Sequence, residues 1–356
     1  MLKPKENIHK FLLSTPSRFV GEYASDELLI SHAWPDLMSP SGSTSLLTES
    51  PIYRTYFVVV LNIENPKEKS IIVPNYHYFG DVVAICMSVL FGKRIDHHGL
   101  LETQGQFCLP TSIQPTPIGM INIGPYNHSP RKDLSIELNF EKFHLIEPLL
   151  RRNNGDKAMN IFIASGSFYL RALQIIEEQP EIAFVDLVTS GEILSNYFDY
   201  KDDELFDENI QKLIEEIHGC HPEPEKAVSQ IKNKLFQVRR KYSLTLSNLL
   251  NKNFFSQSES SEQLACLSQD KIEQRIKASY DLRSRYVHTG LKFGNWITAL
   301  YHHGHEIIVG EPIVHDKHYQ KLLMLTPTFG GLERIIRYCL LRFVHKHISK
   351  IDEMLE

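Results

Sequence analysis

The chain has 356 residues, of which 42% are hydrophobic and 23% are charged, a composition typical of a folded soluble protein with room for two domains. The formal net charge of -5 at pH 7 excludes the broad positive field of a dedicated DNA-binding module, so any contact with nucleic acid is expected at a local site. The longest apolar run, Val82 to Phe91, is shorter than the roughly 20 residues of a membrane span, and the N-terminus lacks a signal-peptide core. We therefore expect a cytoplasmic protein that contacts no membrane.

The first 137 residues are predicted to form a mixed, strand-rich domain. Tyr53 to Ile63 is dense in Tyr, Phe, Val and Ile, and Ser70 to Val73 is a shorter run of the same kind, so both segments favour strands. Gly80 to Gly92 has apolar residues on nearly every face, which indicates one buried helix. Prolines and glycines break Pro110 to Pro125, which predicts an irregular connection there.

From about Leu138 onward the apolar residues recur with the period of a helix. One stripe over residues 161–176 and another over residues 183–198 predict two helices joined by a short turn, with Pro180 in the first turn of the second. Asp202 to Glu208 is acidic and is expected to be solvated.

The rest of the chain continues the helical pattern. Residues 231–242 predict a further helix, and Ser256 to Glu262 reads as a polar linker. A final helix, entered through Thr326-Pro327-Thr328, carries a wide apolar stripe from Leu332 to Ile351. The fold class is therefore α+β, with the strand-rich domain in residues 1–137 and an all-α bundle in residues 138–356.

Cysteine and histidine spacing does not point to a metal site. Five scattered cysteines form neither a Cys-x-x-Cys pair nor an even disulfide framework, which predicts reduced, structural thiols. Two groups contain potential ligands: Asp96, His97 and His98, and His302, His303 and His305. Neither group has the paired spacing of a recognised metal site, and a polar loop or strand edge explains both. We therefore predict no metal site and no cofactor.

The segment that carries chemistry contains Arg283 and His288. In the helical register of its apolar neighbours, Arg283 falls on the face that would be buried, where a guanidinium needs a carboxylate or a phosphate as partner. His288 follows five residues later, roughly 140° around an unbroken helix. Because Gly290 accepts the left-handed conformation, we expect the helix to end at Thr289-Gly290 and to release His288 toward Arg283.

This segment, Tyr280-Asp281-Leu282-Arg283-Ser284-Arg285-Tyr286-Val287-His288-Thr289-Gly290, closely resembles the Arg-x4-His signature of HEPN proteins, in particular the Apea-like group. Three upstream segments look like the first two helices of that domain: Tyr169-Leu170-Arg171-Ala172-Leu173, Ala183 to Val188 and Glu192-Ile193-Leu194. Downstream, Gly331 to Arg337 resembles its last helix. The resemblance places an Apea-like HEPN domain in residues 138–356. The resemblance does not extend to residues 1–137, for which family analogy alone suggests a sensor or regulatory domain.

The resemblance implies metal-independent RNA cleavage, in which a 2′-hydroxyl attacks the adjacent phosphorus. His288 would be the general acid or base, and Arg283 would stabilise charge on the phosphoryl oxygens. Ser284 would orient the phosphate or His288. The family usually works as a homodimer whose two motifs face one cleft, so RNA and a second copy are the expected partners. By analogy, the protein would act in antiviral defence, as abortive infection, or as a toxin-like system with a phage or host trigger.

Alternatives remain for each residue and for the whole protein. Arg283 could pair with a core carboxylate such as Glu192, and His288 could be a hydrogen-bonded helix terminus. Glu192 itself could anchor Arg283 or belong to the cleft. Arg285 could be a solvated surface residue or contact the RNA backbone. The alternative function is a non-catalytic HEPN module that binds RNA or a partner protein as a scaffold, which predicts binding without turnover.

Overall fold

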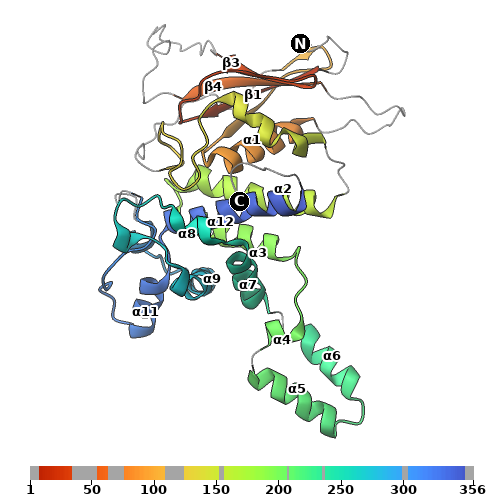
Figure 1. Ribbon diagram of the computed structural model, residues 1–356, viewed down its shortest axis with the longest axis vertical. Coiled ribbons are helices and arrows are strands. Elements are labelled where there is room, and N and C mark those ends of the chain that lie inside the picture. The colour runs from red at the N-terminus through yellow and green to blue at the C-terminus, as the bar shows by residue number, and fades with distance from the viewer. Residues whose placement is uncertain are drawn as a thin grey trace.

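The computed structural model describes residues 8–33, 54–62, 76–108, 124–151, 156–206, 208–234, 237–298 and 304–348. These residues form a six-stranded antiparallel sheet followed by a largely helical region, so the fold is α+β as the sequence predicts. Figure 1 shows the sheet at one end of the molecule and the helices in successive levels below it, with a projecting pair of helices at the opposite end.

The strands are β1 (Ile8–Thr15), β2 (Tyr23–Ala24), β3 (Leu28–Ala33), β4 (Thr55–Asn62), β5 (Asp96–Thr103) and β6 (Gln106–Phe107). They lie in the order β2-β3-β4-β1-β5-β6, and every neighbouring pair is antiparallel. The strand predicted over residues 53–63 is confirmed as β4. The strand predicted over residues 70–73 and almost all of the irregular connection predicted over residues 110–125 lie outside the described residues.

Helix α1 (His77–Phe91) packs against one face of this sheet. Alternate strand residues supply the apolar side chains of that face, as the period of two in a strand requires; they are Phe11, Leu13, Leu28, Ile30, Phe57, Val59 and Leu61. Every residue of α1 from Val82 to Phe91 is buried, so the predicted buried helix is confirmed. The helix ends at Gly92, whose φ of 63° is the left-handed conformation that glycine adopts readily.

The other α-helices are α2 (Lys157–Ile175), α3 (Pro180–Ser195), α4 (Asp202–Leu205), α5 (Glu208–Cys220), α6 (Pro224–Lys234), α7 (Val238–Leu249), α8 (Lys252–Ser256), α9 (Ile272–Thr289), α10 (Asn295–Thr298), α11 (Lys317–Leu325) and α12 (Phe329–His347). Short 3-10 helices are η2 (Phe140–Leu145), η3 (Glu147–Arg151), η4 (Gln263–Ala265) and η5 (Gln269–Lys271). The predicted helix pair is confirmed as α2 and α3, with Pro180 as the first residue of α3. The acidic segment is exposed in α4, as expected.

One helix prediction is wrong. The single helix expected over residues 231–242 is two helices, because α6 ends at Lys234 and α7 begins at Val238 after a non-helical Gln237. The apolar residues keep helical spacing from α6 to α7, so the periodicity did not indicate that there are two separate helices. The segment predicted as a polar linker begins inside α8, and Ser258 then donates to the buried carboxylate of Glu306 at 2.7 Å.

A continuous apolar core joins the strand-rich and helical parts of the chain. Helix α1 packs directly on α2, and a Cβ atom at Gly166 of α2 would lie 2.5 Å from Cγ2 of Ile85 on α1. The absence of a side chain at Gly166 therefore permits this close approach. The last described strand ends at Phe107 and α2 begins at Lys157, and the hydrophobic core continues across the boundary predicted at residue 137.

Helix α12 is buried nearly all round, and its charged residues connect it to distant parts of the chain. Arg337 donates to the main-chain oxygens of Val89 at 3.0 Å and Leu90 at 2.7 Å, which lie in the last turn of α1 where carbonyls lack helical partners. Glu333 accepts two hydrogen bonds from Arg131, at 2.8 and 2.7 Å. The predicted apolar stripe is confirmed within the described residues, but the buried charges beside it were not predicted.

Two further observations concern the hydropathy of the helices and the cysteines. Among the described helices, none combines the length and hydropathy needed to cross a membrane. All five cysteines are free thiols. Cys86 and Cys339 are buried, as structural thiols should be, whereas Cys220 is exposed.

Candidate functional site

Helix α9 carries Arg283 and His288. Its buried residues include Ile272, Ile276 and Leu282, whereas Val287 is 55% exposed, so the predicted apolar stripe reaches solvent at its C-terminal end. The helix ends where the sequence predicts, at Thr289. Gly290 follows with φ 69° and ψ 7°, and its N–H donates to the oxygen of Tyr286 at 2.8 Å, which closes the last turn.

Arg283 lies at the edge of the buried face and contacts helix α3. Its Nη2 donates to Oε2 of Glu192 at 3.1 Å, and the two side chains are 25% and 14% exposed. Burial raises the pKa of the Glu192 carboxyl, and the nearby Arg283 lowers it by a smaller amount. Among the described residues, Nε of Arg283 has no hydrogen-bond partner. The structure therefore provides the carboxylate partner that the sequence suggested, through one contact.

Aromatic residues lie beneath this ion pair. The Tyr280 ring lies 5.9 Å from the Arg283 guanidinium carbon, and the hydroxyl of Tyr242 is 3.0 Å from Oγ of Ser279 in the buried interface between α7 and α9. Burial raises the pKa of Tyr242, so its hydroxyl stays protonated. Gly191, next to Glu192, lets the Tyr242 ring approach α3, since a Cβ there would lie 2.5 Å from Cε2.

His288 is not turned toward Arg283, and that expectation is corrected. The residue remains inside α9, because the helix continues to Thr289, whose hydroxyl donates to the oxygen of Arg285 at 2.7 Å. The two side chains thus leave α9 roughly 140° apart. His288 is exposed and makes no side-chain hydrogen bond with the residues that the structure describes. Within the described part of the chain, no contact joins the side chains of Arg283 and His288.

The remaining predicted site residues differ in their surroundings. Arg285 contacts Asp316 at 3.1 Å and stacks over the Tyr319 ring at 4.3 Å, so it is tied to the start of α11. Asp316 caps that helix, and the N–H of Tyr319 and then Arg285 hold the pKa of its carboxyl below the usual value. Ser284 is half-buried and has no side-chain hydrogen bond within the described part of the chain.

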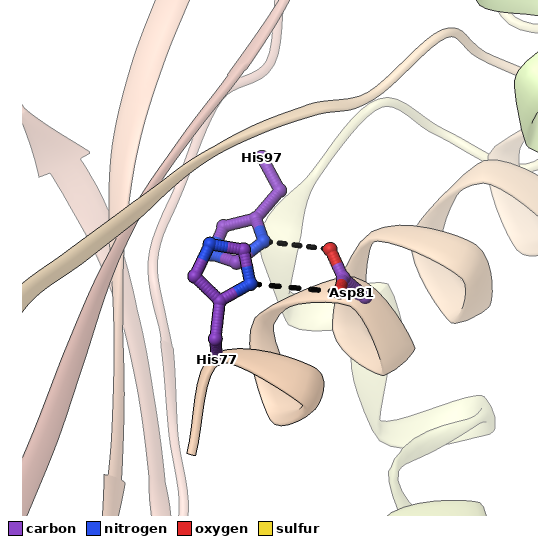
Figure 2. Close-up of side chains that lie close together, drawn as sticks. All are labelled: His77, Asp81 and His97. Atoms are coloured by element: carbon purple, nitrogen blue, oxygen red, sulfur yellow. Dashed lines mark hydrogen bonds and ion pairs between the residues drawn. The ribbon is translucent and has the colours of Figure 1, made fainter. Parts of the chain in front are cut away.

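A second group of polar side chains lies between α1 and the sheet. His77 and Asp81 project from the first turns of α1, and His97 projects from β5 toward them (Figure 2). Spacing along the chain groups His97 with Asp96 and His98, so His77 and Asp81 were not predicted. The His-x3-Asp spacing of His77 and Asp81 places both side chains on one face of a helix. This spacing is the sequence signal that could have identified them. The contribution from β5 requires the tertiary structure.

The histidine groups considered from the sequence separate in space. Asp96 forms ion pairs with Arg54 and Arg94, and His98 is hydrogen-bonded to Ser14 at 2.7 Å. His302 and His303 lie outside the described residues, and His305 lies 3.3 Å from a carboxylate oxygen of Glu262.

Comparison of the chain with protein-family models, with curated proteins and with solved structures finds no match.

Proposed function

We propose that this chain is a HEPN-type endoribonuclease that cleaves RNA without a metal ion and works as a homodimer. The observation that supports this most is the position of Arg283. Its guanidinium is partly exposed and, among the residues that the structure describes, donates one hydrogen bond, to Glu192. It therefore retains donors for an anionic group, and planar, permanently charged guanidinium suits a phosphate.

His288 is the general acid or base in this proposal. It lies in the exposed last turn of α9, where RNA has access, and imidazole exchanges protons near neutral pH. As a base it would take the proton of the 2′-hydroxyl while that oxygen attacks phosphorus. As an acid it would protonate the departing 5′-oxygen. Arg283 would stabilise the charge that develops on the phosphoryl oxygens, with Ser284 available to orient the phosphate.

A second copy completes the site. Arg283 and His288 leave one helix in different directions, so a composite centre requires Arg283 from one copy to face His288 from the other. Val287 and Leu291, which flank His288, are 55% and 51% exposed and offer apolar surface for such a contact. By family analogy, the nuclease would serve antiviral defence or a toxin-like system, and the sheet region would sense a phage or host trigger.

The direct test is cleavage of a labelled single-stranded RNA by the purified protein in the presence of a chelator. Wild type should release products with 2′,3′-cyclic phosphate ends, and His288→Ala and Arg283→Ala should each lose about 100-fold in rate or more. Arg239→Ala is the matched control, because Arg239 forms an exposed ion pair with Asp281 on neighbouring surface. Circular dichroism verifies that each variant is folded. Wild-type rates in both folded site variants would refute the mechanism.

Mixing the two inactive variants tests the composite site. In a heterodimer, the Arg283→Ala chain supplies an intact His288 and the His288→Ala chain supplies an intact Arg283, so one of two sites is complete. Random assortment would restore about a quarter of wild-type activity. Failure to recover activity in verified heterodimers would place both residues of each site in one chain.

The second candidate is a scaffold that binds RNA or a partner protein without turnover. It is favoured by the exposed His288, which lacks an orienting hydrogen bond among the described residues, and by Glu192, which partly neutralises Arg283. RNA binding by wild type with no cleavage in the assay above would support this alternative.

A further inference from the structure

Two imidazoles and a carboxylate converge at the start of α1. Nδ1 of His77 lies 3.6 Å from one oxygen of Asp81, and Nδ1 of His97 lies 2.8 Å from the other. One potential ligand atom from each residue can be chosen so that all three lie within 4.8 Å of one another. Figure 2 shows both rings facing the Asp81 carboxylate from the same side.

We propose that His77, Asp81 and His97 bind a divalent first-row transition metal ion. Ligand atoms at about 2.0 to 2.1 Å from a tetrahedral metal ion are about 3.3 Å apart. The observed separations, 3.6 Å from His77 to one oxygen of Asp81 and 2.8 Å from His97 to the other, are close to that distance. Two histidines with one carboxylate are a donor set that such ions accept, and it leaves coordination positions open. Small side-chain rotations would bring the three atoms into the first coordination sphere.

The fold holds His97 in place before any ion binds. Its side chain is 5% exposed, and its ring packs edge-on to Phe11 with a centroid separation of 5.8 Å. A Cβ at Gly80 would lie 2.3 Å from Nε2 of His97, so the absence of a side chain at Gly80 makes room for the ring against α1. Nε2 is buried and has no hydrogen-bond partner among the described residues, which leaves Nδ1 as the nitrogen that faces Asp81.

Access and charge also suit an ion. His77 and Asp81 are half exposed, at 50% and 51%, so an ion can enter from solvent without opening the fold. The partial positive charge at the N-terminal end of α1 weakly repels a cation, and the negative charge of the Asp81 carboxylate offsets this repulsion. Because the buried Nε2–H of a metal-bound His97 would lack the usual acceptor, we expect an affinity about 10- to 100-fold lower than that of a site with this acceptor in place.

The open coordination positions would lie beside a cavity of about 560 Å³ between α1 and α2. Asp81 and His97 line it on one side, and Asn160 and Ser167 of α2 line it on the other. An ion at the cluster could therefore hold water or a small oxygen-donor ligand that the polar side chains of α2 also contact. This arrangement gives the sheet region a binding site that is separate from Arg283 and His288, so the inference does not depend on the proposed ribonuclease function.

Calorimetric titration of the full-length, chelator-treated protein with Zn²⁺ tests the site, and Co²⁺ absorption reports the coordination geometry. Wild type should bind one ion at this site. Asp81→Asn, which preserves the shape of the side chain, and His77→Ala, which changes a half-exposed residue, should each weaken binding about tenfold or more. His318→Ala, an exposed histidine on α11, should leave the affinity unchanged.

A further variant tests the site without changing any of the three proposed ligands. Gly80→Ala alters none of the three ligands, yet its methyl group would displace the His97 ring and should also weaken binding. The competing interpretation is a hydrogen-bonded cluster in which Asp81 simply accepts N–H groups from the histidines. Absence of saturable Zn²⁺ and Co²⁺ binding by wild type, or wild-type affinity in both folded His77→Ala and Asp81→Asn, would establish that interpretation and overturn the proposal.

Discussion

Arg283 on α9 and Glu192 on α3 form a single 3.1 Å contact, in which burial shifts the pKa of the Glu192 carboxyl more than the neighbouring guanidinium does. The pKa of Glu192 is raised above its ordinary 4.5 although a guanidinium lies next to it. Such a pair is weaker than a bidentate buried salt bridge. The arginine is held at a defined place while part of its hydrogen-bonding capacity remains unused.

Substitution of the two partners should therefore have unequal effects on stability. Arg283→Met leaves a mostly buried carboxylate without its cation and should lower the free energy of unfolding by about 1–3 kcal/mol. Glu192→Gln removes a poorly solvated charge and leaves an amide oxygen for Arg283, so its effect should stay within about 1 kcal/mol. Urea unfolding of the two variants measures the difference. Equal losses would contradict this view of the pair.

The raised pKa of Glu192 predicts a pH dependence. The folded state binds the Glu192 proton more tightly than the unfolded state, so this group stabilises the fold most below its ordinary pKa of 4.5. That stabilisation is lost as pH rises through the higher folded value. Measured against Glu192→Gln, the unfolding free energy of wild type should fall from about pH 4 to about pH 7. A difference that grows with pH would show that Arg283 outweighs burial.

The buried ion pair between Glu333 of α12 and Arg131 should contribute far more to the free energy of unfolding than an exposed ion pair does. Glu333 accepts from two guanidinium nitrogens of Arg131 and from the hydroxyl of Tyr169 at 2.6 Å. Glu333→Gln leaves a buried cation short of its counter-charge and should cost about 3 kcal/mol or more. Glu273→Gln, whose partners Arg240 and Lys277 are partly exposed, should cost less than about 1 kcal/mol. Chemical unfolding compares the two variants, and similar costs would contradict a structural role for the buried network.

Two glycine substitutions test the packing that positions Glu192. A Cβ at Gly191 would lie 2.5 Å from the Tyr242 ring and 3.0 Å from Cδ1 of Ile336, so Gly191→Ala should destabilise the protein by about 1–3 kcal/mol. Gly219→Ala in α5 meets no atom within 4 Å and should be neutral or stabilising by up to about 1 kcal/mol, because alanine favours helix. Thermal unfolding under one set of conditions distinguishes them. A tolerated Gly191→Ala would mean that α3 and α7 can separate.

Local chemistry made several features predictable. Continuous apolar residues over 80–92 indicated a buried helix, Pro180 marked the start of α3, and Gly290 marked the end of α9, and the structure has all three. Each depends on side-chain periodicity or on backbone conformations that one residue type favours. The same reasoning failed at residues 231–242, where helical spacing continued from the end of α6 to the start of α7.

The sequence by itself determined the fold class, the main helices and the need of Arg283 for an anionic partner, because these follow from local propensity and from the cost of burying a charge. Only the tertiary structure decided which way His288 points and which residues meet His97. It also paired Arg131 with Glu333, which are 202 residues apart in the chain. Strand register and helix packing bring such residues together, and neither is encoded in the spacing of neighbouring side chains.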